Sequence, residues 1–275
     1  MFASLTDQCG RQIQLDKPPQ RIICLVPSIT ELLYDLGLEN RIVGITRYCV
    51  HPPQALKEKR VVGGTKKIIN KRLLDLEPDL IICNKEENTS AMVGFCSTVA
   101  TTYVSDISTL EESLEMIQQL GELTDTIAAA STISSKINAL FRNIKPITKP
   151  IPAIYLIWKN PYMSIGTDTF IHDMMEKAGF ENAVAPQTRY PQLELEDLVR
   201  LEPQVVLLSS EPYNFKSSDA VEICSAFAKA EKKPPQCLIV NGELFSWYGS
   251  RMLKSPEYFK ELRAQIEAES VTNSR

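Results

Sequence analysis

LEPDLIICNKEEN, residues 76–88, and LEPQVVLLSSEPY, residues 201–213, are built on one plan. Each begins with Leu-Glu-Pro, continues as an apolar run typical of a buried strand, and ends in a polar loop that carries glutamate. The offset between them, 202 − 77 = 125 residues, is close to half of the 275-residue chain. We interpret the repeat as the sign of a duplicated architecture.

A second internal match supports the duplication. LGLENRIVG (36–44) is similar to AGFENAVAP (178–186), at an offset of 181 − 39 = 142 residues. The two offsets differ by 17 residues, a length that the longer predicted loop at 46–69 can absorb. Chance similarity is the alternative, because Leu-Glu-Pro ends many helices before a strand. Two matches in the same order favour duplication.

Strands alternate with helices in both halves, which predicts parallel sheets with helices on both faces. In the first half we expect a hairpin over 1–17, strands at 21–27, 41–45, 80–83 and 101–104, and helices at 28–37, 70–77, 90–99 and 108–120. In the second half we expect strands at 153–158, 205–210 and 237–240, and helices at 168–179, 193–202, 218–230 and 256–268. Ser28 with Glu31 predicts a capping box for the first helix, and Thr167 or Asp168 is the expected cap of the helix that Gly179 ends.

Between the halves, apolar residues recur at helical spacing over 122–146, and the prolines that follow forbid continuation. The predicted fold is α/β, with two Rossmann-like lobes that contain parallel sheets and are joined by one long interlobe helix. The expected domains are an N-terminal lobe (1–121), the helix (122–146) and a C-terminal lobe (147–275).

Composition excludes several classes of protein. The net charge of −4 and the lack of a basic stripe argue against nucleic acid as a partner. No apolar run approaches the roughly 20 residues that span a bilayer. The N-terminus lacks the pattern of a secretory leader, and the seven cysteines contain no CxxC pair. We therefore expect a cytoplasmic protein, or a periplasmic or membrane-anchored one if a leader was removed.

Aromatic residues gather in the loops that follow the predicted strands. These are Tyr48, Trp158, Tyr162, Tyr190, Tyr213, Trp247 and Tyr248. Ligands of open parallel sheets bind beyond the carboxyl ends of the strands. If both lobes turn those ends toward each other, the rings line one cleft for a large, flat or apolar ligand. The alternative is that the rings pack the loops onto the sheets.

RIICLVPSITELLYDLGLENRIVGIT (21–46), YCVHPPQA (48–55) and LEPDLIICN (76–84), with the interlobe helix, resemble the helical-backbone (class III) substrate-binding proteins of ABC transporters. These serve cobalamin, haem and ferric siderophores, and the cobalamin-binding branch is the most similar. The resemblance covers nearly the whole chain. It implies a non-enzymatic binding protein that holds its ligand between two lobes.

The resemblance also implies site residues. Tyr48 matches the aromatic of the Y-x-x-x-P-P loop, Tyr190 a pocket tryptophan, and Met163 a pocket phenylalanine. Ser28, Trp247 and Tyr248 fall in ligand-contacting loops, and Thr65 and Asn84 replace two other pocket tryptophans. With Trp158, Tyr162 and the anion-binding candidate Arg251, the predicted ligand-binding residues are Ser28, Tyr48, Trp158, Tyr162, Met163, Tyr190, Trp247, Tyr248 and Arg251.

Members of the family dock each lobe on a permease through a glutamate. Glu196 matches the second-lobe glutamate, whereas Lys71 stands at the first-lobe position. A lysine there would repel a permease arginine. Glu196 makes an ABC permease a candidate partner, whereas Lys71 and the absent leader pattern favour a cytoplasmic relative that does not dock on a transporter. The chain is expected to be a monomer.

His51, beside Cys49 and Tyr48, is a candidate ligand for iron, zinc or cobalt, with a hydrogen-bonded loop histidine as the alternative. No phosphate loop, GxGxxG or G-x-S-x-G motif is present, so no catalytic residue is predicted. The preferred function is binding of a metal-containing macrocycle or chelate: cobalamin or another corrinoid first, then haem or a ferric siderophore. No cofactor is required. The rival interpretation is a cytoplasmic enzyme or a metal-cofactor carrier on the same scaffold.

Overall fold

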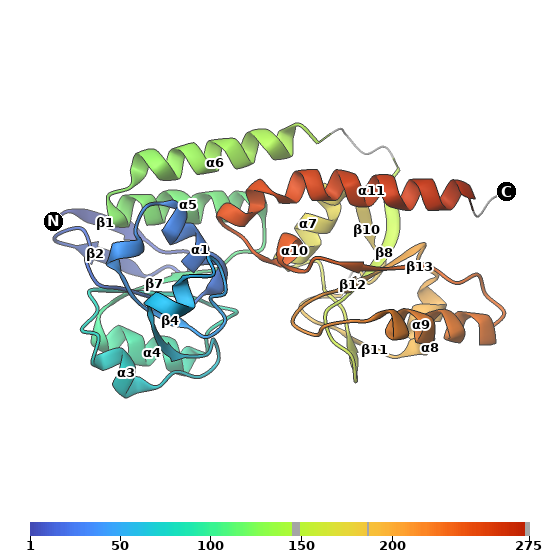
Figure 1. Ribbon diagram of the computed structural model, residues 1–275, viewed down its shortest axis with the longest axis horizontal. Helices are drawn as coiled ribbons and strands as arrows, with labels where there is room; N and C mark the ends of the chain where they lie inside the picture. Colours follow the sequence, from blue (N-terminus) through green and yellow to red (C-terminus); the bar gives the residue numbers. More distant parts are fainter. Residues whose placement is uncertain (145–148, 186, 273–275) are drawn as a thin grey trace. The chain divides into compact units, whose positions relative to one another are not determined.

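The computed structural model describes residues 1–144, 149–185 and 187–272, and the chain divides into two compact units (Figure 1). The first unit consists of Met1–Ile107, Glu111–Ala139 and Tyr248–Leu253. The second unit consists of Ser108–Leu110, Leu140–Trp247 and Lys254–Arg275. Residues 248–253 thus belong to the first unit, although the residues on either side of them belong to the second.

A five-stranded parallel sheet forms the centre of the first unit. Its strands in spatial order are β5 (Arg60–Gly63), β4 (Ile42–Thr46), β3 (Ile22–Cys24), β6 (Leu80–Asn84) and β7 (Thr101–Ser105). The helical segments of this unit are α1 (Pro27–Asp35), η1 (Glu39–Arg41), α2 (Ala55–Glu58), α3 (Asn70–Leu74), α4 (Ser90–Val99), nearly all of α5 (Leu110–Thr124), most of α6 (Ile127–Arg142) and η2 (Ser250–Leu253).

Helices cover both faces of this sheet, because every residue of β6 is buried and needs apolar contacts on each side. On one face, Ile81 and Cys83 pack with Leu73 of α3 and with Met92 and Cys96 of α4. On the other face, the hydroxyl of Tyr103 in β7 donates to Oε1 of Gln119 in α5 at 2.7 Å.

The second unit contains a four-stranded parallel sheet in the order β10 (Phe180–Asn182), β8 (Ile151–Leu156), β12 (Val205–Ser209) and β13 (Gln236–Val240). A small antiparallel ribbon joins β9 (Tyr162–Met163) to β11 (Gln192–Leu193). The helices are α7 (Phe170–Ala178), α8 (Leu195–Leu201), α9 (Ser217–Lys229), α10 (Glu243–Ser246) and α11 (Ser255–Thr272). Strand residues Ile154 and Val206 pack with α8 and α9, while the Tyr155 ring lies 5.2 Å from that of Phe245 in α10.

The two sheets share a plan that matches the sequence repeat. The order β4-β3-β6-β7 in the first unit corresponds to β10-β8-β12-β13 in the second, and β5 is an addition at one edge. Glu77 and Glu202 of the two Leu-Glu-Pro turns both have left-handed backbone conformations, with φ of 42° and 46°. Gly37 and Gly179, from the second match, have φ of 78° and 88°. The predicted α/β class with two parallel-sheet units is therefore confirmed.

The helix predicted over 122–146 is two helices. The chain turns at Asp125, whose φ is 60°, and α6 then folds back along α5 (Figure 1). α6 ends at Arg142, and the predicted end at 145–146 lies outside the described residues. The periodicity continued through the break because the buried faces of both helices meet, with Ala130 packed on Gly121.

Other local predictions also need correction. The first helix starts at Pro27 with Val26 as its N-cap. Ser28 therefore lies inside the helix, and Ser28 and Glu31 do not form a capping box. Thr169, rather than Thr167 or Asp168, caps α7 by accepting a hydrogen bond from the His172 amide. The predicted loop over 46–69 contains α2 and β5.

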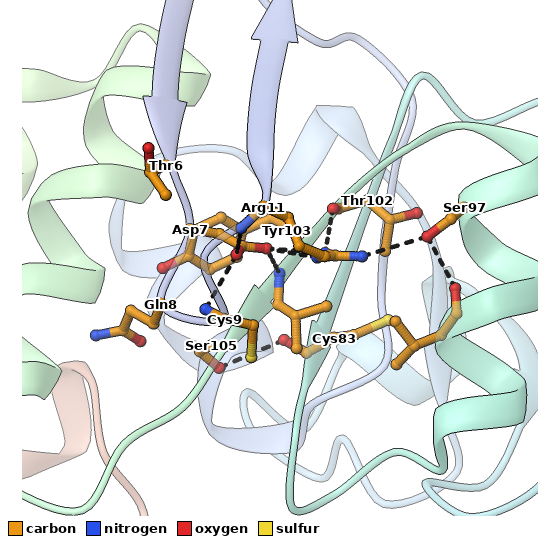
Figure 2. Close-up of polar contacts among 12 residues, drawn as sticks. Thr6, Asp7, Gln8, Cys9, Arg11, Cys83, Ser97, Thr102, Tyr103 and Ser105 are labelled. Carbon is orange, nitrogen blue, oxygen red and sulfur yellow. Dashed lines mark hydrogen bonds and ion pairs between the residues drawn. The ribbon is translucent and has the colours of Figure 1, made fainter.

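The predicted N-terminal hairpin is confirmed as β1 (Ala3–Thr6) paired with β2 (Gln12–Leu15), and a buried carboxylate fastens it to the first sheet (Figure 2). Asp7 accepts hydrogen bonds from the amides of Cys9, Arg11 and Val104 at 2.9–3.0 Å. The Arg11 guanidinium completes the contact, with Nε donating to Asp7 at 2.9 Å and another nitrogen to the Thr102 carbonyl at 2.5 Å. The hairpin therefore lies beside the edge strand β7.

The contact between α5 and α6 gives a test of the fold. Gly121→Ala is expected to lower the free energy of unfolding by about 1–3 kcal/mol, because the added methyl group would lie 2.4 Å from the Cβ of Ala130. Gly94→Ala in α4 is the control. Its added methyl group has nothing within 4 Å, and it should raise stability by about 0.5–1 kcal/mol. Urea denaturation followed by circular dichroism measures both, and equal stabilities would contradict this packing.

Candidate functional site

The carboxyl ends of the first sheet's strands carry a set of loops that we call the first loop cluster. It comprises Ser28 at the start of α1 after β3, Tyr48 after β4, Thr65 after β5, and Glu86 and Glu87 after β6. We add Tyr248 of the 248–253 segment, which lies beside Ser28. Because all five strands are parallel, the loops that follow them leave the sheet on the same side, at the carboxyl ends of the strands. A ligand of a parallel sheet is expected at these carboxyl ends.

Tyr48 is the exposed aromatic of this cluster, with 53% of its surface accessible. The next residue, Cys49, is fully buried, and its Sγ lies 3.2 Å from Thr30 Oγ1 and 3.3 Å from Thr46 Oγ1. Gly64 lies under the ring, since a Cβ there would be 3.2 Å from Tyr48 Cε2. The loop backbone is therefore anchored while the Tyr48 ring remains available.

Two asparagines organise the loop after β6. Asn84 Oδ1 accepts from the amides of Glu86 and Glu87 at 2.8 and 2.9 Å, and Asn84 Nδ2 donates to Ser105. Asn88 Oδ1 accepts from the Asn84 amide at 2.9 Å, and its Nδ2 donates to the Thr65 carbonyl at 2.9 Å. The buried amides thus hold Glu86 and Glu87, both half-buried, in one arrangement.

The 248–253 segment packs on α1. Arg251 donates from Nε and a terminal nitrogen to the two carboxylate oxygens of Glu31 at 2.7 and 2.8 Å, and both side chains are largely buried. Tyr248 is buried beside Ser28, which is also buried. Burial raises the pKa of Tyr248 well above its usual value, and the carboxylates of Glu87 and Glu86 raise it further. Arg251 is thus an anchor of the segment, and its predicted anion contact stays a prediction.

The second loop cluster lies at the carboxyl ends of the strands of the second sheet. It comprises Trp158 after β8, Glu211 and Tyr213 after β12, and Trp247 after α10. Trp158 is 41% exposed, and its ring centroid lies 5.8 Å from that of Tyr213 in an edge-on arrangement. Trp247 is almost buried, with Nε1 donating to Glu211 Oε1 at 2.9 Å. Trp158 is therefore the exposed aromatic residue of the second loop cluster.

Lys159, the residue after Trp158, belongs to a charged group that no local sequence pattern predicted. Lys159 Nζ donates to Asp219 Oδ1 at 2.6 Å and to Glu222 Oε2 at 2.8 Å, and Tyr162 donates its hydroxyl to Glu222 Oε1 at 3.0 Å. Tyr162 is a buried core residue of this unit rather than an exposed one. Partners about 60 residues apart meet only after folding, so spacing could not reveal them.

The remaining predicted residues lie at the surface or near it. Tyr190 is half-buried, with the Arg189 guanidinium 5.4 Å from its ring centroid, and Met163 pairs with Gln192 in the β9–β11 ribbon. His51 is half-buried in the loop after Tyr48. Within residues 1–144, 149–185 and 187–272, no three His, Cys, Asp or Glu side chains are grouped to hold a metal ion. Glu196 is exposed on α8.

A groove of about 630 Å³ lies elsewhere in the first unit. It is lined by β2, the end of α4 and the amino end of β7, including Arg11, Ser97 and Thr102 (Figure 2). Ligands of parallel sheets bind at the opposite, carboxyl end of the strands. The Arg11 charge is also matched by Asp7, so we take the loop cluster of each unit, described separately, as the candidate binding surface of that unit.

Comparison with known proteins identifies the family. The family model described as periplasmic binding protein matches residues 22–232, and the chain belongs to that family. It is 26% identical over 217 residues to an uncharacterized ABC transporter substrate-binding lipoprotein, YvrC, of Bacillus subtilis, covering 74% of this chain and 68% of that protein. It is 27% identical over 202 residues to a vitamin B12-binding protein of Vibrio cholerae, covering 70% and 71%.

A solved structure shows the same fold. The periplasmic vitamin B12 binding protein BtuF of Vibrio cholerae superposes with a TM-score of 0.74 at 24% identity, covering 90% of this chain and 98% of that one. The predicted resemblance to substrate-binding proteins is therefore confirmed. No helix among the described residues is long and apolar enough to span a membrane.

The Lys159 group predicts a pH dependence. Hydrogen bonds to Asp219 and Glu222 raise the pKa of Lys159, while the Lys159 contacts lower the pKa of Glu222 and outweigh the effect of burial on the pKa of Asp219. Carboxylates with lowered pKa values stabilise the fold above their unfolded pKa of about 4 and lose that contribution as the pH falls further. The thermal midpoint should therefore fall more between pH 5 and pH 3 in the unmodified chain than in Lys159→Met. The control Lys229→Met, at an exposed position of α9, should follow the unmodified chain, and identical profiles in all three would contradict the contact.

Proposed function

We propose that this protein is the ligand-binding component of an ABC-type uptake system and that its ligand is a metal-containing macrocycle or chelate. Corrinoids such as cobalamin come first, then haem and ferric siderophores. The observation that carries the proposal is the pair of exposed rings, Tyr48 and Trp158, each on a carboxyl-edge loop of its own sheet. Exposed aromatics on anchored loops suit a large, flat ligand. The likeness to a vitamin B12-binding protein supports the choice of ligand.

Charge in the first loop cluster favours a corrinoid over the anionic alternatives. Glu86 and Glu87 are half-buried and act together on the pKa of Tyr248, so their carboxylates lie near its phenol. Corrinoid side chains end in amides, whose N–H groups can donate to carboxylates. Haem propionates and carboxylate siderophores would be repelled there. Glu86 and Glu87 are thus proposed to select a neutral, amide-bearing ligand.

The ligand supplies its own metal in this proposal, and the protein requires no cofactor. His51 would contact cobalt or iron only as a single axial ligand. The family consists of binding proteins, and we propose no catalysis, so ligand recovered after incubation should be chemically unchanged. An altered ligand would instead favour the enzyme interpretation.

A transporter permease is the proposed partner, and the protein is proposed to act as a monomer. Glu196 and Lys71 occupy equivalent positions of the repeat, 196 − 71 = 125 residues apart, and both are exposed. Lys71 pairs with Asp75 at 3.0 Å. A permease for this chain would therefore present a basic group to α8 and an acidic one to α3. The relative in Bacillus subtilis is a lipoprotein and the one in Vibrio cholerae is periplasmic, which lends no support to a cytoplasmic location for this chain.

Ligand titration tests the proposal. Cyanocobalamin is expected to quench tryptophan fluorescence with a Kd in the micromolar range or below. Trp158→Ala and Tyr48→Ala should each weaken binding about tenfold or more, equivalent to about 1.4 kcal/mol. Val221→Ala on α9, which removes an apolar side chain that is 65% exposed, is the control and should leave Kd unchanged. No micromolar binding of cyanocobalamin, haemin or a ferric hydroxamate would refute the proposed function.

Ligand choice has its own test. Glu86→Gln with Glu87→Gln should strengthen haemin binding by about tenfold relative to cyanocobalamin, because two like charges facing the propionates are removed. The isosteric amides keep the volume of both side chains. An unchanged ratio of the two dissociation constants would show that these carboxylates do not select the ligand.

A further inference from the structure

The seven cysteines differ in their surroundings, and most are buried. Cys24 Sγ donates to the Val26 carbonyl oxygen at 3.3 Å, and Cys49 Sγ lies 3.2 Å from Thr30 Oγ1. Cys83 and Cys96 are free thiols that hydrogen-bond to each other inside the first unit, and both are fully buried. Cys9 is exposed on the N-terminal hairpin. Cys224 and Cys237 combine proximity with partial exposure.

The geometry of this last pair is close to that of a cross-link. Cys224 Sγ on α9 lies 3.8 Å from Cys237 Sγ on β13 and also 3.8 Å from the Pro235 carbonyl oxygen. A disulfide has sulfur atoms about 2.05 Å apart, so a movement of less than about 2 Å joins them. Ile223 and Phe227 hold α9 in the core, and β13 is the edge strand of the sheet. The two thiols therefore face each other from packed elements of the second unit, and both are partly exposed to solvent.

We propose that Cys224 and Cys237 form a redox-active dithiol, a modification site that small-molecule disulfides oxidise to an intramolecular disulfide. The Cys224 thiolate attacks one sulfur of oxidised glutathione and releases one reduced glutathione. Cys237 then attacks the Cys224 sulfur of the mixed disulfide and releases the second. The two thiols lose two protons and two electrons, and the glutathione disulfide takes them up as two thiols.

The surroundings support this order of attack. Burial and the neighbouring Cys224 raise the pKa of the Cys237 thiol, which keeps Cys237 protonated while Cys224 reacts first. The product joins residues 237 − 224 = 13 positions apart, across the connection between α9 and β13. Since α9 also carries Asp219 and Glu222, the cross-link would fix the helix that holds Lys159 behind Trp158.

Peptide mapping tests the proposal on the full chain carrying Cys9→Ser, which removes the exposed thiol. After incubation with oxidised glutathione and alkylation of free thiols, mass spectrometry should find a Cys224–Cys237 cross-linked peptide and alkylated cysteines elsewhere. The thermal midpoint should rise by roughly 5 °C and return to its first value with dithiothreitol.

Cys224→Ser and Cys237→Ser in the same background are the matched controls, and neither should show the cross-link or the rise in thermal midpoint. The mapping of the unsubstituted pair does not depend on how these controls fold. Free thiols at both positions after oxidation, a stable glutathione adduct on Cys224, or a cross-link between other cysteines would each overturn the proposal.

Discussion

Parallel pairing of a buried central strand with its neighbours is the constraint on which each unit depends. β6 pairs with β3 and β7, and β12 pairs with β8 and β13, always in the same direction. Every strand must then be followed by a return segment, so the loops after the strands collect at one edge. The Leu-Glu-Pro turns serve this arrangement, since a left-handed glutamate ends the preceding segment and the proline prevents the helix from continuing. Tyr48 and Trp158 lie on loops at the carboxyl ends of the strands as a result of this parallel pairing.

Each loop cluster combines buried polar anchors with one exposed ring. In the first unit, Asn84 and Asn88 satisfy the loop backbone, and the buried Arg251–Glu31 pair holds the segment that carries Tyr248. In the second unit, Lys159 and Glu211 hold the chain around Trp158 and Trp247. A ring on a fixed loop loses little conformational freedom when a ligand binds, which favours affinity. The positions of the two exposed rings thus depend on these buried anchors.

Much of the fold could be predicted from the sequence because the signals were local. The apolar runs at 80–84 and 205–209 became the central strands, and Gly179 ended α7 as expected. The break at Asp125 was missed because the apolar face continues across it, and β5 was missed because prolines and glycines around it resemble a loop. For the site, aromatic content drew attention to the loops but did not separate exposed Tyr48 from Tyr162, which packs in the core of the second unit and donates its hydroxyl to Glu222 far along the chain. Long-range ion pairs leave no periodic trace in a sequence.

We propose that the loops at the carboxyl ends of the strands, rather than any other surface, receive the ligand. A crystal structure of the chain with cyanocobalamin would show where the ligand binds. We expect electron density for the corrin in contact with the Tyr48 or the Trp158 ring and, where it lies against Tyr48, ligand amides that donate to Glu86 or Glu87. A corrin located in the groove lined by Arg11, Ser97 and Thr102, with both rings untouched, would contradict it.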